Sequence, residues 1–333
     1  MAKNLRMNKK DVTLGIVLIL SFALSACQTT STHKVLKLAH GLDPSHPVHK
    51  GIVFMAERVA EKSKGQLIID VYPSGQLGSE QQCVELLQIG SLAITKVSGA
   101  VLEGFTPSYK ALSLPYVFRS QEHAYHVFDG EIGKEILLSS EKNWIRGLCF
   151  YDAGFRSFYS IDKPILSPDD LQGMKIRVQK SQMAMDMVKA LGGSATPISY
   201  GELYTALQSG VVDGAENNPP SLYTSHHYEV CKEYSLDEHT CVPDVLIIGT
   251  KVWNNLSERE KKWLQEAADE SVDIQRKFWA ESVDESYREV QAAGVTIHRP
   301  DKTKFAEKVN DLLEEYRQSK EIGDLVRRIE ATQ

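Results

Sequence analysis

The sequence has few of the features that mark proteins that bind nucleic acid or span membranes. It contains 38 Lys and Arg and 44 Asp and Glu residues, a net charge of −6, and no Lys/Arg run. A nucleic-acid surface needs clustered basic residues, so we expect no nucleic-acid partner. One long apolar run occurs, near the N-terminus, and no second one follows. We therefore expect no membrane span beyond that first segment.

Cysteines are few and irregularly spaced, with no CxxC pair. Beyond the N-terminal segment they are Cys83, Cys149, Cys231 and Cys241. This spacing argues against a zinc site. Cys231 and Cys241 are near each other in sequence and could pair in an exported protein, whereas Cys83 and Cys149 fit equally well as buried free thiols.

The motifs of common enzyme classes are missing. The sequence has no GxSxG, HExxH, GxxxxGK[ST] or GxGxxG, and no carboxylate pair stands out as an acid/base dyad. His40, His46 and His49 form a cluster, but histidines so placed are more often solvated or hydrogen-bonded than metal-bound. We therefore predict a protein that is not an enzyme and that uses no metal or cofactor.

The N-terminus reads as an export signal. Four basic residues precede the apolar run VTLGIVLILSFAL, which is short for a membrane span, so residues 1–26 are predicted to be a signal peptide. The tetrapeptide LSAC resembles a bacterial lipobox, which implies lipidation of Cys27; the alternative is an ordinary cut near Ala26 with an incidental cysteine. Gln28 favours the periplasmic face of the outer membrane. Residues 27–34 then form a lipidated tether, and the anchor is the only expected membrane contact.

Strand and helix patterns alternate along the rest of the chain. Strands are expected at 35–40, 66–73 and 91–98, with helices at 46–62 and 80–90 between them. A similar second unit has strands at 147–160, 174–178 and 211–217 and helices at 181–191 and 201–210. Ser199 and Glu202 fit a capping box that opens the last of these helices. This order predicts right-handed crossovers and mainly parallel sheets.

The C-terminal third is helical and charged. A long helix begins after Ser257 and contains no glycine before Gly294; a short strand and terminal helices follow in 295–333. The helix is long enough to brace two lobes. The predicted fold class is therefore α/β and two-lobed, with each lobe a mainly parallel sheet flanked by helices and a long helix spanning both.

Polar residues interrupt the apolar strands of the second unit at or near their ends. They are Arg156 in GFRSF, Arg177 in KIRV and Asn217 in GAENNPPS. A lone arginine on a strand is usually solvated, but two arginines and an amide at equivalent places are less expected by chance. Arginine grips a carboxylate with two hydrogen bonds, and asparagine adds a donor. Ligands bind at the carboxyl ends of strands in open α/β sheets, so these residues predict a carboxylate clamp.

Several ordered motifs resemble those of a known family. They are YPSGQLGSE (72–80), LPYVFRS (114–120), DLQGMKIRV (170–178), ELYTALQSGVVDGAEN (202–217) and a W…LSE…AA segment from Trp253. The chain resembles the DctP-type extracytoplasmic solute-binding subunits of TRAP transporters from about residue 35 to the C-terminal helices. The resemblance implies a receptor that closes on an organic acid and delivers it to TRAP membrane subunits. It also implies lobe I from 35–153 plus 243–282 and lobe II from 154–242 plus 283–333.

The resemblance assigns roles to individual residues. Arg177 is expected to form the main bidentate salt bridge to the ligand carboxylate, with Arg156 and Asn217 at the same end of the ligand. Tyr200 is expected to pack against the ligand. Independently of the resemblance, the restricted backbone of proline predicts that Pro219 and Pro220 hold the exit from the strand extended, while Asn218 satisfies backbone groups.

A narrower resemblance is to members that bind hexuronates such as glucuronate and galacturonate. It rests on LAHGLDPSHPVHKG (38–51), TKVSGAVLE (95–103) and ENNPPSLYTSHHYEV (216–230). It implies hydroxyl-binding groups on the opposite lobe, here His40, His46, Glu80, Lys96 and Ser98. Leu222 and His226 depart from this group, which has Phe and Arg there. The alternatives are a receptor for an aldonate, 2-keto acid, dicarboxylate or sialic acid, or an exported sensory receptor or enzyme on the same fold.

Overall fold

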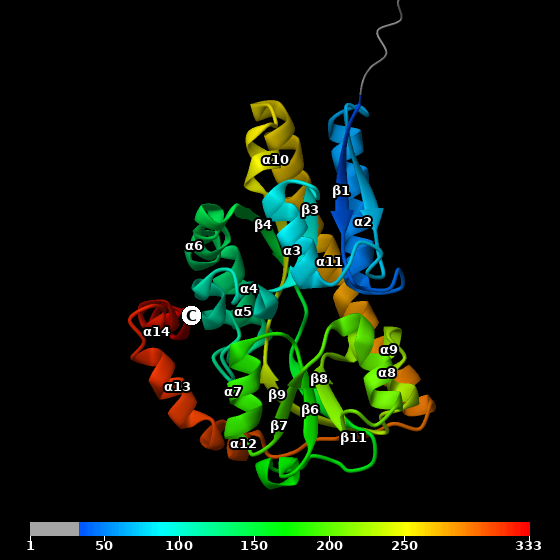
Figure 1. Ribbon diagram of the computed structural model, residues 1–333, viewed down its shortest axis with the longest axis vertical. Helices are drawn as coiled ribbons and strands as arrows, with labels where there is room; N and C mark the ends of the chain where they lie inside the picture. Colours follow the sequence, from blue (N-terminus) through cyan, green and yellow to red (C-terminus); the bar gives the residue numbers. More distant parts are fainter. Residues whose placement is uncertain (1–32) are drawn as a thin grey trace, which may run out of the picture. The chain divides into compact units, whose positions relative to one another are not determined.

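A computed structural model of the protein describes residues 33–333 (Figure 1). The predicted signal peptide, the predicted lipidation site Cys27 and residues 28–32 of the predicted tether lie outside the described residues. Two sheets organise the described part of the chain, and helices pack alongside each of them.

The first sheet has five strands in the order β2-β1-β3-β10-β4. Their bounds are β1 Lys34–Ala39, β2 Leu67–Tyr72, β3 Ile94–Ser98, β4 Ile145–Tyr151 and β10 Asp244–Gly249. Strands β1 and β3 are parallel, whereas β10 runs antiparallel to both β3 and β4. A reversed strand therefore lies inside a sheet of otherwise mainly parallel direction, and its first residue is at the carboxyl ends of its neighbours.

Helices and 3₁₀ turns lie around the first sheet, and they include the predicted helices at 46–62 and 80–90. They are α2 Pro47–Lys62, α3 Glu80–Ile89, α4 Gly99–Leu102, η1 Pro107–Leu112, α5 Gln121–Asp129, α6 Glu131–Ser139, η2 Glu141–Asn143 and α10 Thr250–Asn254. His46 caps α2 by accepting from the amide of Val48. Ser79 and Gln82 form a capping box on α3, which ends at Gly90 with φ 88°. Glycine tolerates that left-handed conformation, so the chain turns there into β3.

The second sheet has six strands in the order β11-β9-β5-β8-β6-β7. Their bounds are β5 Arg156–Ser160, β6 Lys175–Val178, β7 Ser194–Pro197, β8 Gly214–Asn217, β9 Glu233–Thr240 and β11 Thr296–His298. Strand β5 is antiparallel to both β8 and β9, while β6 is parallel to β7 and β8. The predicted strand at 147–160 is thus two strands, β4 and β5, which belong to different sheets.

The helices and 3₁₀ turns of the second half are η3 Pro168–Leu171, α7 Gln182–Ala190, η4 Tyr200–Glu202, α8 Leu203–Gln208, α9 Pro219–Thr224 and η5 His227–Glu229.

Two local predictions in this half are wrong. Ser199 makes no capping bond, because a 3₁₀ turn, η4, precedes α8. Pro219 and Pro220 begin helix α9 instead of an extended segment, since proline lacks only an amide that the first turn of a helix leaves unpaired. Asn218 does serve the backbone, by accepting from the amide of Ser221 at 2.9 Å.

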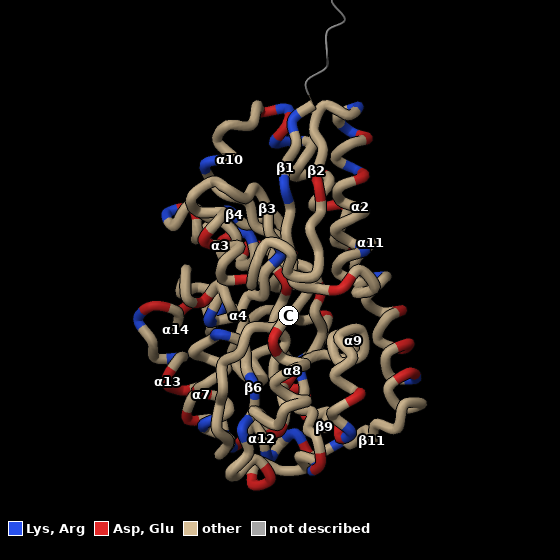
Figure 2. Tube along the Cα trace, turned by 45° about the vertical axis from the view of Figure 1, so that its right-hand side comes forward, with Lys and Arg blue, Asp and Glu red and all other residues tan. Residues whose placement is uncertain are grey.

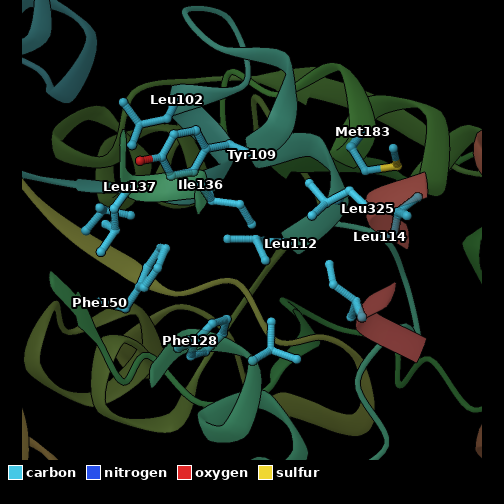
Figure 3. Packing of buried hydrophobic residues seen from close by; sticks show 14 of the residues in the cluster. Leu102, Tyr109, Leu112, Leu114, Phe128, Ile136, Leu137, Phe150, Met183 and Leu325 are labelled. Atoms are coloured by element: carbon cyan, nitrogen blue, oxygen red, sulfur yellow. The ribbon is translucent and has the colours of Figure 1, made fainter. Parts of the chain in front are cut away.

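The longest helix, α11 Glu258–Ala292, contacts α2 and β4 of the first half and α9 of the second (Figure 1). Helices α12 Lys302–Lys308, α13 Asn310–Arg317 and α14 Gly323–Ala331 follow β11. Helix α14 packs against α6 and η1. Figure 3 shows the apolar cluster that joins these parts, where Met183 of α7 and Leu325 of α14 lie with Leu112 and Phe128. The division of the chain into two lobes remains a prediction.

The charged residues are distributed as the sequence indicates, and the cysteines are unpaired. Figure 2 shows basic and acidic residues interspersed along the trace. In residues 33–333, no helix is long and apolar enough to cross a membrane. All four cysteines of this part are free and buried, so Cys231 and Cys241 do not pair.

Candidate ligand-binding site

A cavity of about 660 Å³ is lined by residues from both sheets. Because β5 and β10 are reversed, their first residues, Arg156 and Asp244, lie at the same sheet edges as the last residues of β8 and β3. The lining therefore collects strand ends from each sheet. Its polar side chains include Glu80, Lys96, Ser98, Arg156, Arg177, Gln179, Tyr200, Asn217, Asn218, Ser221 and Asp244.

Arg177 on β6 is the least compensated charge of this cavity. Its side chain is 2% exposed, and its Nε donates to the carbonyl oxygen of Ile198 at 2.9 Å. Its Nη1 is buried without a hydrogen-bond partner among residues 33–333. The guanidinium lies 5.9 Å from the ring centroid of Tyr200. Burial lowers the pKa of Arg177 from its ordinary value, yet arginine stays protonated in proteins. A buried cation that lacks an anion is a site for one.

Arg156, by contrast, is already held by the protein. Its Nε and Nη2 donate to the carboxylate of Glu216, and Nη2 also donates to the Glu216 carbonyl oxygen at 2.7 Å. Its Nη1 donates to Oδ1 of Asn217 at 2.8 Å. The amide of Asn218 donates to the same Oδ1 at 3.0 Å. The Asn217 oxygen is thus occupied, which leaves its amide NH₂ to donate into the cavity.

A second buried pair lies behind Arg156. Nδ1 of His239 is 2.8 Å from a carboxylate oxygen of Asp237, and its Nε2 is 3.5 Å from Glu216. Burial disfavours the charged imidazole, but Asp237 and Glu216 outweigh it and raise the pKa of His239 to about 9. Burial likewise opposes the charge of Glu216, but Arg156 and His239 lower its pKa to about 2. The four groups alternate in sign and fix the position of the Arg156 guanidinium.

The first sheet contributes a different set of charges. Nζ of Lys96, a side chain 3% exposed, lies 2.8 Å from Oε1 of Glu80 and 3.1 Å from Oδ1 of Asp244. The amide of Ser98 also donates to Oε1 of Glu80, at 3.3 Å, and Ser98 Oγ donates to Gln179 of the second half. Burial alone would lower the pKa of Lys96, but Asp244 and Glu80 raise it overall.

Two predicted residues lie behind the cavity lining. His40 and His46 are buried and absent from the lining. Nε2 of His40 is 3.0 Å from Nδ1 of His49, and burial lowers the pKa of His40 to about 3. His46 caps α2, and its Nε2 lies 3.3 Å from the hydroxyl of Ser221, which does line the cavity. Because burial lowers the pKa of both His40 and His46, the two side chains are neutral and pack behind the residues that line the cavity. Within the described chain, no group of three or more His, Cys, Asp or Glu residues could hold a metal ion.

The other predicted residues do line one cavity: Glu80, Lys96, Ser98, Arg156, Arg177, Tyr200 and Asn217. Sequence reasoning missed Asp244, Gln179, Ser221 and the supporting pair Glu216 and His239. Two of these had a visible signal, because Glu216 precedes Asn217 directly and Asp244 follows a proline at a strand start. The other three depend on tertiary structure.

The chain is similar in sequence and in structure to proteins of one known family. The profile of the DctP family, the bacterial extracellular solute-binding proteins of family 7, matches residues 38–319. A solute-binding protein of Chromohalobacter salexigens is 37% identical over 293 residues, which are 87% of each chain. A TRAP periplasmic solute-binding protein of Anaerococcus prevotii, solved with D-glucuronate, is 39% identical with a TM-score of 0.87, over 89% of this chain and 97% of that one. One from a Bradyrhizobium species, solved with D-galacturonate, is 39% identical with a TM-score of 0.88, over 90% of this chain and 100% of that one. The chain therefore belongs to the DctP family of bacterial extracellular solute-binding proteins.

Proposed function

We propose that this protein is the solute-binding receptor of a TRAP transporter and that it captures a hexuronate such as glucuronate or galacturonate. The observation that carries the proposal is Arg177, which lines the cavity from β6 and whose buried Nη1 has no partner among the described residues. A carboxylate removed from water needs a charged, hydrogen-bonded partner, and a guanidinium supplies one. The relatives solved with glucuronate and galacturonate support the same ligand class.

The roles of the other groups follow from their free donors and acceptors. Asn217 offers its amide NH₂, while Arg156 is held in place by Glu216 and keeps one Nη1 proton for the ligand. Lys96, Ser98 and Asp244 on the first sheet, together with Glu80 on α3, face the hydroxyl end. A ligand that bridges both sheets stabilises the closed arrangement through contacts that exist only there. This is a binding cycle and includes no chemical step, so we propose a receptor and no catalysis.

Calorimetry with D-galacturonate and D-glucuronate tests the proposal. We expect micromolar or tighter binding by the wild-type protein, and a loss of at least about 100-fold in Arg177→Lys, which keeps the charge but lacks the two-pronged geometry. Arg259→Lys, on helix α11, serves as the matched control and should bind as the wild type does. Unchanged affinity in Arg177→Lys would refute the clamp. A thermal-shift screen over organic acids shows whether another acid stabilises the protein more.

We also propose that the receptor works in the periplasm, where lipid on Cys27 anchors it in the periplasmic leaflet of the outer membrane, and that it delivers its ligand to TRAP membrane subunits. Labelling of cells with a clickable fatty acid tests the anchor. The wild-type protein should take up the label and Cys27→Ser should not. Label in both proteins would refute lipidation at this cysteine.

A further inference from the structure

The buried charges of the cavity are unequally divided between the two sheets. On the second sheet, two guanidinium groups, Arg156 and Arg177, face one carboxylate, Glu216, and His239 is matched by Asp237. That side carries one surplus positive charge, located on Arg177. On the side of the first sheet, the ammonium of Lys96 is matched by two carboxylates, Asp244 on β10 and Glu80 on the adjoining helix α3. The first side therefore carries one surplus negative charge.

Strand register explains why the three charges of the first sheet stay together. Asp244 pairs with Ser98 and Leu246 pairs with Lys96, so Lys96 and Asp244 point to the same face of the sheet. Glu80 reaches the same ammonium from the first turn of α3. Lys96 is 3% exposed, and both of its salt bridges lie within this cluster. The positive charge of Lys96 is consequently neutralised by Glu80 and Asp244 and is not available to a ligand.

The free atoms at this end are acceptors. The hydrogen bonds to Lys96 use Oε1 of Glu80 and Oδ1 of Asp244, which leaves Oε2 and Oδ2 to receive hydrogen bonds from a ligand. The two side chains remain 14% and 11% exposed, so their oxygens are reachable from the cavity. The other charged lining residues, Glu85, Lys180 and Glu202, are exposed, and water screens them. Among the charged lining residues, the two arginines and the buried cluster of Glu80, Lys96 and Asp244 are therefore the least screened by water.

We propose that this cluster restricts the receptor to sugar acids with a single carboxylate and excludes the diacids of the same carbon chain, with Asp244 as the specificity-determining residue. The inference rests on the proposed function, because it assigns the far end of the same ligand. A hydroxyl opposite Arg177 donates to Glu80 or Asp244. A second carboxylate in that place can donate nothing and meets the surplus negative charge of largely buried side chains, which is strongly unfavourable.

Two linear acids of equal length isolate the effect of charge from that of ring shape. D-Galactonate ends in a CH₂OH group where galactarate has a second carboxylate. With the purified wild-type protein, calorimetry should give a dissociation constant for galactarate at least about 100-fold above that of the tighter of galactonate and galacturonate. Wild-type binding of galactarate within about threefold of that monoacid would overturn the inference.

Amide variants test the residues named. Asp244→Asn removes the surplus charge and should lower the galactarate-to-monoacid ratio of dissociation constants by at least about tenfold, and Glu80→Gln should act in the same direction. Asp70→Asn, an exposed position on β2, is the matched control and should leave the ratio unchanged. A ratio that stays at the wild-type value in both cavity variants would also overturn the inference. Absence of binding to every sugar acid would refute the proposed function itself, which is a distinct result.

Discussion

Arg156 and Glu216 form a fully buried ion pair across neighbouring strands of the second sheet. Nη2 of Arg156 donates to Oε1 of Glu216 at 2.9 Å, and the two side chains are 6% and 3% exposed. Strand β5 is antiparallel to β8, and Ser157 pairs with Asn217, which places the two charges side by side, with Arg156 at the cavity. Arg156, which the sequence predicts to bind the ligand, thus already forms an ion pair within the protein.

Removal of one partner of this pair should be costly. Glu216→Ala leaves a buried guanidinium without its main anion, and we expect the free energy of unfolding to fall by about 3–5 kcal/mol. Urea denaturation measures the loss. Glu307→Ala, on the exposed side of α12, should change stability by less than about 0.5 kcal/mol. Equal stability of the two variants would contradict the buried pair.

His239 should make stability depend on pH in the alkaline range. Its pKa is raised above the unfolded value of 6.5 to about 9, so the protonated form stabilises the fold. This contribution is complete below pH 6.5 and disappears as the pH rises through about 9. We expect His239→Gln to be less stable than the wild type at pH 6 by at most about 3 kcal/mol, with the difference narrowing by pH 9.5. Thermal unfolding across this range is the measurement, and a constant difference would be evidence against a charged His239.

Asn218 should stabilise helix α9 as its N-cap. Its Oδ1 accepts from the amide of Ser221 at 2.9 Å. Loss of this bond in Asn218→Ala should cost about 1 kcal/mol, while Asn218→Ser, which can also cap, should cost less. Urea midpoints at an unchanged denaturant slope provide the comparison. If alanine and serine at this position gave the same midpoint, the cap would not be the cause.

Gly154 should tolerate no side chain in the segment that joins β4 to β5. Its φ is 58°, and an added Cβ would lie 3.0 Å from the Trp279 ring. We expect Gly154→Ala to lower the free energy of unfolding by about 1–3 kcal/mol. Gly173→Ala is matched in backbone conformation, with φ 78° and no neighbour within 4 Å, and should cost only the backbone strain, about 1 kcal/mol. Thermal melts of both variants separate the contact with Trp279 from the strain, and an equal cost would show that the contact is unimportant.

Local signals in the sequence predicted the fold well where short-range chemistry decides. The helix at 46–62, the helix stop at Gly90 and the long helix after Ser257 all occur as α2, α3 and α11. Each depends on a cap, a glycine or a periodic apolar stripe that can be seen within a few turns. The α/β fold with two sheets and a long helix is likewise confirmed.

Direction and pairing of strands could not be predicted in the same way. The sequence gives no indication that β5 and β10 run against their neighbours, because that depends on which segments pair far along the chain. Glu216 as the partner of Arg156, and Asp244 as a partner of Lys96, follow from these reversals. The capping box expected at Ser199 failed for a related reason, since packing favours a 3₁₀ turn before α8.

The reversed strands also tie ligand chemistry to chain connectivity. Residues 152–155 and 241–243 cross from one sheet to the other, and each crossing ends directly on a charged residue of the cavity, Arg156 or Asp244. These two groups therefore lie directly beside the segments that connect the two sheets. We expect substitutions there to change the rates at which a bound acid associates and dissociates as well as its affinity, so selectivity and exchange kinetics are linked in this receptor.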